Sequence, residues 1–324
     1  MPAWRLYDPA SACGSLTRCF SVPPERGIRR QMSAPHDAPM YSLRKSLLLV
    51  AACGMLASCK EGVLDPRGPI GHAERLILSD ATTIMLAVVV PVIVLTLAFA
   101  WWFRAGNRRA RYRPDWEYSG RIEVIIWSIP ALLILFLGGM AWISSHELDP
   151  PTPLAAREAP VEVEVIALDW RWLFIYPEYG IASLNQLTVP SGRPIHFKLT
   201  ATSVMNSFFI PQLGSQIYTM PGVTTQLSLQ ADEVGTYQGL SAQFSGDGFA
   251  DMRFEVAAKA PQEFQQWIAQ ARARGGTLSR ATFAQLLKPA RAGEPLTFAQ
   301  ADPELFAMVS SGRIATRWSP EEAR

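Results

Sequence analysis

The side chains with the clearest chemical pattern lie between Tyr237 and Met252. Within that segment, Ser241, Ser245, Phe249 and Met252 follow one another at spacings of four, four and three residues. A copper ion held at such positions would need thiolate or imidazole ligands, because copper prefers soft sulfur and nitrogen donors. A serine hydroxyl is a poor substitute, and a phenyl ring has no lone pair to give. We therefore expect no copper site here, although the Met252 thioether is a soft donor.

The cysteines restrict the rest of the chain in the same way. All four cysteines of this 324-residue chain lie within its first 59 residues, and the last of them is Cys59. Beyond that point the chain cannot form a disulfide, a thiolate metal site or a cysteine nucleophile.

The composition favours a membrane protein with a sizeable soluble part. Hydrophobic residues make up 49% of the chain and charged residues only 18%. The formal net charge is +2, so bulk electrostatics does not indicate a nucleic-acid partner. The length allows one or two domains in addition to membrane segments.

Residues 1–58 are interpreted as a leader that carries a lipoprotein signal. Arg44 and Lys45 precede the apolar run Leu47–Leu56, and small residues follow it before Cys59. A basic region, a short apolar run and small residues before a cleavage point are typical of a secretory signal. The run has about ten residues, too few to span a bilayer.

The end of this leader, Leu56-Ala57-Ser58-Cys59, resembles the bacterial lipobox. The resemblance implies cleavage before Cys59 and attachment of acyl chains to that residue, which would anchor the chain to a membrane. Cleavage before Cys53 is an alternative. Translation could also start at Met32 or Met40, because the polar stretch before the basic residues is long for a signal.

Two long apolar runs predict a transmembrane hairpin over residues 79–145, after a periplasmic segment over residues 59–78. The spans are expected at about 81–103 and 122–143, and Pro91 and Pro130 should kink them. Glu123, near the start of the second run, is interpreted as interfacial or as facing a partner subunit. Five arginines lie between residues 104 and 113, which places this short loop on the cytoplasmic side and the soluble part on the other.

Residues 158–260 predict an all-β sandwich. Val161, Val163 and Val165 alternate with Glu162 and Glu164, which is typical of a half-buried strand. Further strands are expected at 187–189, 195–199, 224–229 and 252–256, with turn residues between them. No alternation of strands and helices is visible, so a Rossmann-type fold is not expected.

Residues 261–324 predict a helical arm. Apolar residues recur at helical spacing over 264–271, and the run ends at Gly275. Ser279 can cap a second helix, which Pro289 stops. Asp302-Pro303-Glu304 is typical of a helix start, with Asp as the cap and Pro in the first position. We expect the aromatic stripe of the arm to pack against a neighbour.

Three segments together resemble subunit II of the haem-copper oxidases. Residues 206–216 are similar to the upstream copper loop of that family, and residues 169–177 to its aromatic strand. Residues 237–252 are similar to its second copper loop, which reads Cys-x3-Cys-x3-His-x2-Met in copper-bearing members. The likeness covers roughly residues 70–260. The helical arm and the lipobox narrow it to subunit 2 of the bo3-type ubiquinol oxidases.

The resemblance implies which residues occupy the ligand positions of the copper centre. They are Asn206, Ser241, Gln243, Ser245, Phe249 and Met252. The Gln243 position serves through its backbone carbonyl, and only Met252 retains the family's side-chain ligand. We expect Met252 to pack in the core and Asn206 to hydrogen-bond in place of an imidazole. Trp170 and Trp172 of the aromatic strand are expected to pack rather than to pass electrons.

The resemblance also implies a fold class and a function. The fold expected is membrane-anchored α+β, with a two-helix transmembrane hairpin, a cupredoxin-like all-β sandwich and the helical arm. The function expected is that of the non-redox subunit 2 of a proton-pumping terminal quinol oxidase in a bacterial inner membrane. Haems and copper would belong to the large partner subunit, alongside small membrane subunits. Ubiquinol would be the electron donor, not cytochrome c, and no catalytic, cofactor or metal site is expected in this chain.

Two other functions remain open from the sequence. One is a copper-binding cytochrome c oxidase subunit, against which the missing thiolates argue. The other is a free-standing lipoprotein that binds or delivers a partner.

Overall fold

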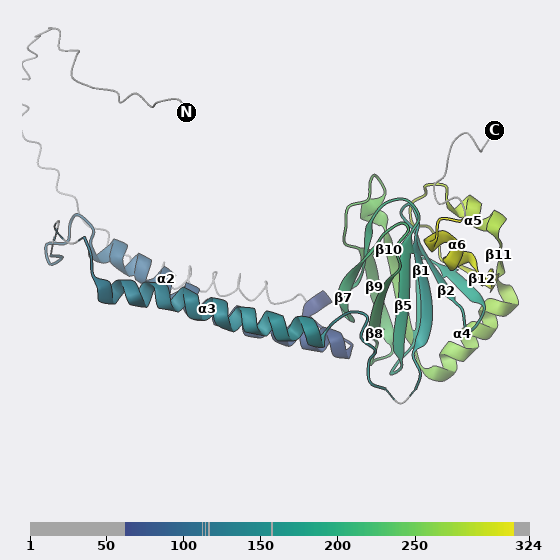
Figure 1. Ribbon diagram of the computed structural model, residues 1–324, viewed down its shortest axis with the longest axis horizontal. Coiled ribbons are helices and arrows are strands. Elements are labelled where there is room, and N and C mark those ends of the chain that lie inside the picture. The colour runs from purple at the N-terminus through teal and green to yellow at the C-terminus, as the bar shows by residue number, and fades with distance from the viewer. Residues whose placement is uncertain (1–61, 112, 114, 116, 157, 314–324) are drawn as a thin grey trace, which may run out of the picture. The chain divides into compact units, whose positions relative to one another are not determined.

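The computed structural model describes residues 62–313, except residues 112, 114, 116 and 157. The predicted leader and the predicted lipidation at Cys59 lie outside the described residues. The described chain begins with a short 3-10 helix, η1 (Gly62–Leu64), followed by the long helices α2 (Pro69–Trp102) and α3 (Gly120–Glu147). Figure 1 shows the order of these elements along the chain.

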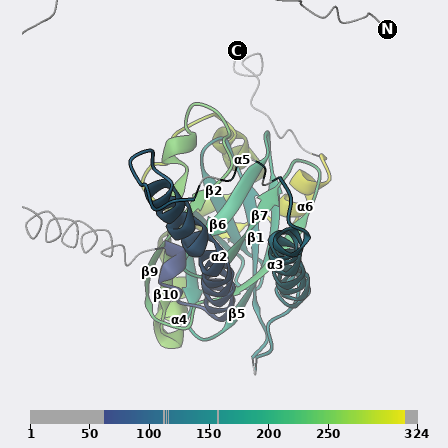
Figure 2. The ribbon, with the colours of Figure 1, turned by 90° about the vertical axis from the view of Figure 1, so that its left-hand side faces the viewer.

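By length and composition, α2 and α3 could each cross a membrane. Pro91 and Pro130 lie inside them, as expected. Both helices are longer than the apolar runs that predicted them. In particular, α2 begins at Pro69 because its polar first turns pack against the soluble domain, a contact that hydropathy does not register. Figure 2 looks along the two helices toward the strands.

The soluble domain is a sandwich of two sheets. A seven-stranded sheet has the order β11-β12-β3-β2-β1-β5-β8, and a five-stranded sheet has the order β4-β10-β9-β6-β7. The strands are β1 (Val161–Ala167), β2 (Trp172–Tyr176), β3 (Ile181–Leu184), β4 (Gln186–Pro190), β5 (Pro194–Ala201), β6 (Asn206–Ile210), β7 (Gly214–Thr219), β8 (Thr225–Gln230), β9 (Gly235–Ser241), β10 (Arg253–Lys259), β11 (Gly276–Leu278) and β12 (Leu296–Ala301).

The strands predicted from alternation are confirmed. In β1, Val161, Val163 and Val165 are fully buried, while Glu162 and Glu164 are partly exposed. Strands β4, β5, β8 and β10 occupy the other predicted positions. Burial raises the pKa of the Glu164 carboxyl, and the nearby Lys198 opposes that shift.

An aromatic core joins the two sheets. Trp172 and Phe174 from β2 meet Phe208 from β6 and Phe254 from β10, with ring centroids 5.3 Å apart for Trp172–Phe208 and 5.2 Å for Phe208–Phe254. All four rings are buried. Such ring pairs add to the burial of apolar area that stabilises a sandwich. Trp172 therefore packs in the core, as expected.

The C-terminal arm contains helices α4 (Pro261–Arg274), α5 (Arg280–Leu286) and α6 (Leu305–Ser310), and it also contains the strands β11 and β12. The sandwich thus does not end at residue 260, because β12 pairs with β3 and extends the larger sheet. Phe283, Phe298 and Leu305 cover the outer face of that sheet through Leu173 and Ile175. In Figure 1 the yellow-green arm lies on this side.

The helix starts of the arm are partly as predicted. Ser279 caps α5, since its hydroxyl accepts from the backbone N–H of Thr282. The expected start is wrong by two residues, because Glu304 takes the cap position expected for Asp302 and α6 begins at Leu305. The Asp302 carboxylate instead accepts from the Glu304 backbone N–H at 3.0 Å, which lowers its pKa together with the hydrogen bond from Arg280.

The first turns of α2 are joined to the sandwich by backbone contacts. The N–H of Arg67 donates to Gln212 O at 2.6 Å, and the N–H of Gly71 donates to Leu213 O at 3.0 Å. A Cβ at Gly68 would lie 2.1 Å from the carbonyl oxygen of Gln230, so only glycine fits there. We call this contact of residues 65–74 with residues 212–215 and 230–233 the hairpin junction.

Candidate functional site

The six predicted ligand positions lie at one end of the five-stranded sheet. Asn206 is the first residue of β6, and Ser241 is the last residue of β9. Residues 242–252, which we call the ligand loop, connect β9 to β10 and contain the 3-10 helix η2 (Phe249–Asp251). Strands β6 and β9 pair with Phe208 opposite Ser241, which brings Asn206 beside the start of the ligand loop.

Asn206 and Ser241 are in direct contact. Their side chains are 2% and 3% exposed, so each polar atom needs a partner within the protein. The Ser241 hydroxyl lies 3.1 Å from the Asn206 side-chain oxygen and 3.2 Å from the Gln243 backbone carbonyl, so it has two acceptors in reach of its single proton. The expectation that Asn206 hydrogen-bonds within this site is confirmed.

Met252 closes the ligand loop from the other side. Its backbone carbonyl accepts from the N–H of Ser241 at 3.0 Å, and its own N–H donates to Phe249 O at 3.0 Å. The thioether is 1% exposed, and the Ser245 hydroxyl lies 3.9 Å from its sulfur. Met252 therefore packs in the core, as expected, with a hydroxyl as its polar neighbour.

Phe249 is half-buried and makes an aromatic contact. Its ring packs against Phe244, with the centroids 5.6 Å apart in an edge-to-face arrangement. Phe244 itself is 71% exposed. The position that carries an imidazole in copper-bearing members of the resembling family thus holds part of an aromatic pair on the outside of the ligand loop.

Trp170 holds the ligand loop in place. It adopts a left-handed backbone conformation with a φ of 67°, which is costly for a residue with a side chain. Its indole N–H donates to Ser245 O at 3.1 Å, and its ring packs so closely on Gly248 that a Cβ there would lie 2.3 Å away. Trp170 is half-buried and packs, as expected, but its partners were not predicted.

A half-buried arginine connects the same region to the arm. One terminal nitrogen of Arg171 donates to Leu286 O at 2.6 Å and to Lys288 O at 2.8 Å, at the end of α5. Burial lowers the pKa of Arg171, and the charge of Asp169 opposes that shift. The connection between β1 and β2, which carries Trp170, is therefore held by the arm as well as by the sandwich.

The side chains gathered here do not fit a copper ion. They offer two hydroxyls, one amide oxygen and one thioether, whereas copper in proteins takes thiolate and imidazole ligands. Within residues 62–313 as described, no group of three or more His, Cys, Asp or Glu side chains could hold a metal ion. We therefore derive no electron-transfer step through this loop.

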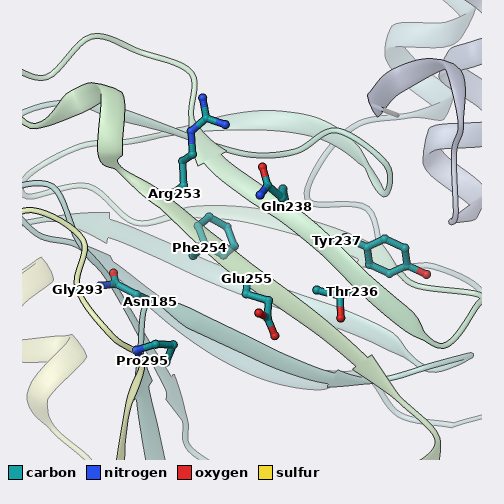
Figure 3. A pocket seen from close by; sticks show the side chains of 9 residues that line it. All are labelled: Asn185, Thr236, Tyr237, Gln238, Arg253, Phe254, Glu255, Gly293 and Pro295. Carbon is teal, nitrogen blue, oxygen red and sulfur yellow. The ribbon is translucent and has the colours of Figure 1, made fainter. Parts of the chain in front are cut away.

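A separate hollow lies beside β9 and β10. It has a volume of about 280 Å3, and none of the six ligand positions lines it. Figure 3 shows Arg253 and Glu255 pointing in opposite directions from β10, so their charges do not converge on one point. The lining residues are Asn185, Thr236, Tyr237, Gln238, Arg253, Phe254, Glu255, Gly293 and Pro295.

Comparisons with known proteins address the family directly. The sequence signature described as "Cytochrome C oxidase subunit II, periplasmic domain" matches residues 179–258. The chain is 46% identical over 271 residues to "Cytochrome bo(3) ubiquinol oxidase subunit 2" of Pseudomonas aeruginosa, which covers 84% of this chain and 80% of that protein. It is 47% identical over 255 residues to "Ubiquinol oxidase subunit 2" of Acetobacter aceti, which covers 78% of this chain and 82% of that protein.

Among solved structures, the periplasmic domain of subunit II of cytochrome oxidase from Bradyrhizobium japonicum matches 37% of this chain and 99% of that domain. The sequence identity is 21% and the TM-score is 0.35, and a likeness this loose carries no further conclusion.

Proposed function

The chain belongs to the ubiquinol oxidase subunit 2 family of the haem-copper oxidases, and on this premise we propose that it is a subunit without a redox centre of its own. In the proposed complex, the large partner subunit holds the haems and copper, oxidises ubiquinol and reduces oxygen to water. That subunit also moves protons across the membrane. The present chain supports its assembly and caps its periplasmic face.

The observation that carries this proposal is the donor set around Ser241. A hydroxyl bonded to an amide oxygen and a second hydroxyl beside a thioether occupy the places where thiolates and imidazoles would be needed. A soluble cytochrome that docked here would find no metal to receive its electron. Electrons must then enter the complex elsewhere, and ubiquinol is the donor named for the relatives.

A structural role needs a rigid connection between the membrane helices and the soluble domain, and the hairpin junction is suited to it. The N–H of Asp232 donates to Arg67 O at 2.8 Å, and Ser215 donates to the carboxylate of Glu74 on α2. Backbone hydrogen bonds on both sides of Gly68 leave this segment little freedom. The sandwich would therefore keep its position relative to a partner that packs against α2 and α3.

The surface that would cap the partner lies around the ligand loop. Val204, Met205, Val223 and Phe244 are 40%, 38%, 43% and 71% exposed. They come from loops at the same end of the sheet, since Asn206 pairs with Thr219 and contacts Ser241. Exposed apolar side chains gathered at one place are typical of protein contacts. We propose that this surface meets the periplasmic face of the large subunit.

The proposed location is the inner membrane of a bacterium, with the sandwich in the periplasm and acyl chains on Cys59. Cys59 precedes the first described residue, Gly62, by three positions. Lipid at this point would add an anchor ten residues before α2 begins in the chain. Mass spectrometry of the mature N-terminus would find an acylated Cys59, and an unmodified residue upstream of it would contradict the assignment.

Co-purification tests the proposed complex. An affinity tag on this chain should bring down a large haem-bearing subunit from mild detergent, and the preparation should oxidise ubiquinol with consumption of oxygen. Purified chain that runs alone and carries no haem would overturn the proposal and favour a free-standing lipoprotein.

Copper analysis distinguishes a subunit of a ubiquinol oxidase from a copper-binding subunit of a cytochrome c oxidase. The full chain expressed alone should hold no copper after removal of loosely bound metal. Near-stoichiometric copper that disappears in an Asn206→Ala, Met252→Leu double variant would contradict our reading of the ligand loop.

The capping surface has its own test. Phe244→Glu should reduce the haem subunit recovered with the tagged chain, because it puts a charge into the proposed contact. Leu296→Glu is the matched control, since Leu296 is 51% exposed but lies on β12 of the arm. Equal recovery from both variants would remove Phe244 from the proposed contact.

A further inference from the structure

The loop between α2 and α3 carries a concentration of positive charge that neither the fold nor the proposed function uses. Its arginines are all exposed, and acidic residues occur only toward its end, at Asp115 and Glu117. Within the described part of the chain, none of these arginines forms an ion pair. They are Arg104, Arg108, Arg109, Arg111 and Arg113.

Aromatic side chains mark both ends of this loop. Trp101 and Trp102, at the end of α2, are 63% and 45% exposed, and Tyr118, just before α3, is 74% exposed. Such residues favour the boundary between hydrocarbon and headgroups. The guanidinium of Arg104 lies 4.9 Å from the centroid of the Trp101 ring and donates to Trp101 O at 3.0 Å. The loop therefore starts at the depth of the lipid headgroups.

The remaining arginines are free for another partner. Asn107 follows α2 and binds the last residue of that helix, since its side-chain amide donates to Trp102 O at 2.6 Å. Its side-chain oxygen accepts from the Arg109 backbone N–H at 3.1 Å. These bonds hold the backbone of the loop against the helix end. They leave the guanidinium groups of Arg108, Arg109 and Arg111 pointing into open surroundings.

We propose that this arginine loop binds the phosphate groups of anionic phospholipids in the adjoining leaflet. A guanidinium offers paired donors that match two oxygens of one phosphate, and the negative potential of an anionic leaflet attracts such clusters. Because the loop connects two helices that are long and apolar enough to cross a membrane, its arginines would lie within reach of the headgroups of the adjoining leaflet. The orientation of the hairpin needs only positive charge, whereas headgroup binding also uses the shape of the guanidinium.

Lipid binding by the purified complex tests this inference without using enzyme activity. Phosphatidylglycerol and phosphatidylcholine are titrated into the detergent-solubilised complex, and bound lipids are counted by native mass spectrometry. The triple variant Arg108→Gln, Arg109→Gln, Arg111→Gln should bind phosphatidylglycerol more weakly by roughly fivefold per arginine, with phosphatidylcholine unaffected. The control Arg253→Gln, Arg274→Gln, Arg313→Gln removes the same charge from exposed sites on the soluble domain and should leave both lipids unaffected.

A second triple variant, with lysine at the same three loop positions, guards against a change in membrane orientation. It keeps the positive charge, so it should insert normally and lose less affinity than the glutamine variant. Undiminished phosphatidylglycerol binding by the glutamine variant would overturn the proposal. So would displacement of the lipid by millimolar inorganic phosphate, which would indicate a site for the free anion. Loss of a subunit with lipid binding intact would assign the loop to a protein contact instead.

Discussion

Strand β6 joins two regions that are held together by different kinds of contact. At its start, Asn206 meets the ligand loop, where side-chain contacts dominate and apolar groups such as Phe244 face outward. At its end, Ile210 leads into the hairpin junction, where backbone hydrogen bonds and the close approach at Gly68 dominate. One short strand thus separates an end that is open to a partner from an end that is closed onto the chain's own helices.

The difference shows how the ligand loop keeps its conformation through contacts within the protein. The ligand loop is held by Trp170, by the Asn206–Ser241 contact and by the backbone bond from Ser241 to Met252. None of these requires a metal. The hairpin junction, in contrast, tolerates little change, because its partners are backbone atoms that cannot move aside separately. Five substitutions probe this contrast.

The largest effect is expected at the hairpin junction. Gly68→Ala would put a Cβ against the backbone carbonyl of Gln230, so strands and helix must shift to accept it. We expect a loss of about 1–3 kcal/mol in the free energy of unfolding of the sandwich. Thermal unfolding of the purified chain measures it. Gly106→Ala is the control, because nothing lies within 4 Å of a Cβ there. An unchanged unfolding temperature for Gly68→Ala would show that the junction is not closely packed.

A smaller effect is expected at the ligand loop from a similar change. Gly248→Ala would meet the side chain of Trp170, which is half-buried and can swing away. The cost is then mainly the indole hydrogen bond to Ser245 O, about 1 kcal/mol. Gly276→Ala, where a Cβ has open space, is the control. If Gly248→Ala cost as much as Gly68→Ala in the same unfolding experiment, the contrast between the two ends would fail.

Tyr237→Phe, beside the hairpin junction, is expected to lower the free energy of unfolding at neutral pH by a comparable or slightly smaller amount. The Tyr237 hydroxyl donates to Glu233 O at 2.6 Å, a bond worth about 1 kcal/mol. Burial raises the pKa of Tyr237, and the negative charge of Glu233 adds to the shift. The folded protein therefore holds this proton to higher pH than the unfolded chain does.

The sign of the pH dependence follows from that difference. The contribution of Tyr237 is complete below a pH of about 10, where the unfolded tyrosine is still protonated, and falls as the pH rises further. Unfolding temperatures measured from pH 8 upward should thus converge for the wild type and Tyr237→Phe. Tyr218→Phe is the matched control, because Tyr218 is 47% exposed and lies on β7 at the end of the sheet that carries the ligand loop. If the unfolding temperatures of the wild type and Tyr237→Phe kept a constant difference up to strongly alkaline pH, the raised pKa of Tyr237 would be contradicted.

The smallest effect is expected for single thiols in the ligand loop. Ser241→Cys or Ser245→Cys supplies one soft donor without the partners that copper needs, so ubiquinol oxidase activity per haem should not change. Ser241→Cys weakens a buried hydrogen bond and should cost about 1 kcal/mol, and Ser245→Cys less. A large loss of activity in a fully assembled complex would show that the loop takes part in more than folding.

Much of the architecture could be predicted from local patterns. Apolar run length identified α2 and α3, and alternation identified β1, because each of these signals lies within one segment. The strands β11 and β12 were not predicted. Strand β11 has only three residues, and β12 becomes a strand by pairing with β3, more than a hundred residues earlier in the chain. No local pattern carries that pairing.

The candidate site divides in the same way. The chemistry of its donors could be read from the residue types at Asn206, Ser241 and Met252, and the Asn206 hydrogen bond was expected. The role of Trp170 was not, because its partner Ser245 lies 75 residues away and its left-handed backbone has no signature in the sequence. The arginine loop was read only as an orientation signal, since its exposure and its lack of ion pairs are spatial facts.

The sequence by itself determined which atoms are available: no thiol beyond Cys59, no imidazole beyond His196, and two runs apolar enough to cross a bilayer. Donor chemistry and hydropathy are properties of residue types, so no fold could alter them. Only the tertiary structure decided that Ser241 bonds Asn206, that Phe249 packs against Phe244 and that Gly68 must remain a glycine. Those outcomes depend on distances between segments far apart in the chain, and such distances are set by the packing of the two sheets.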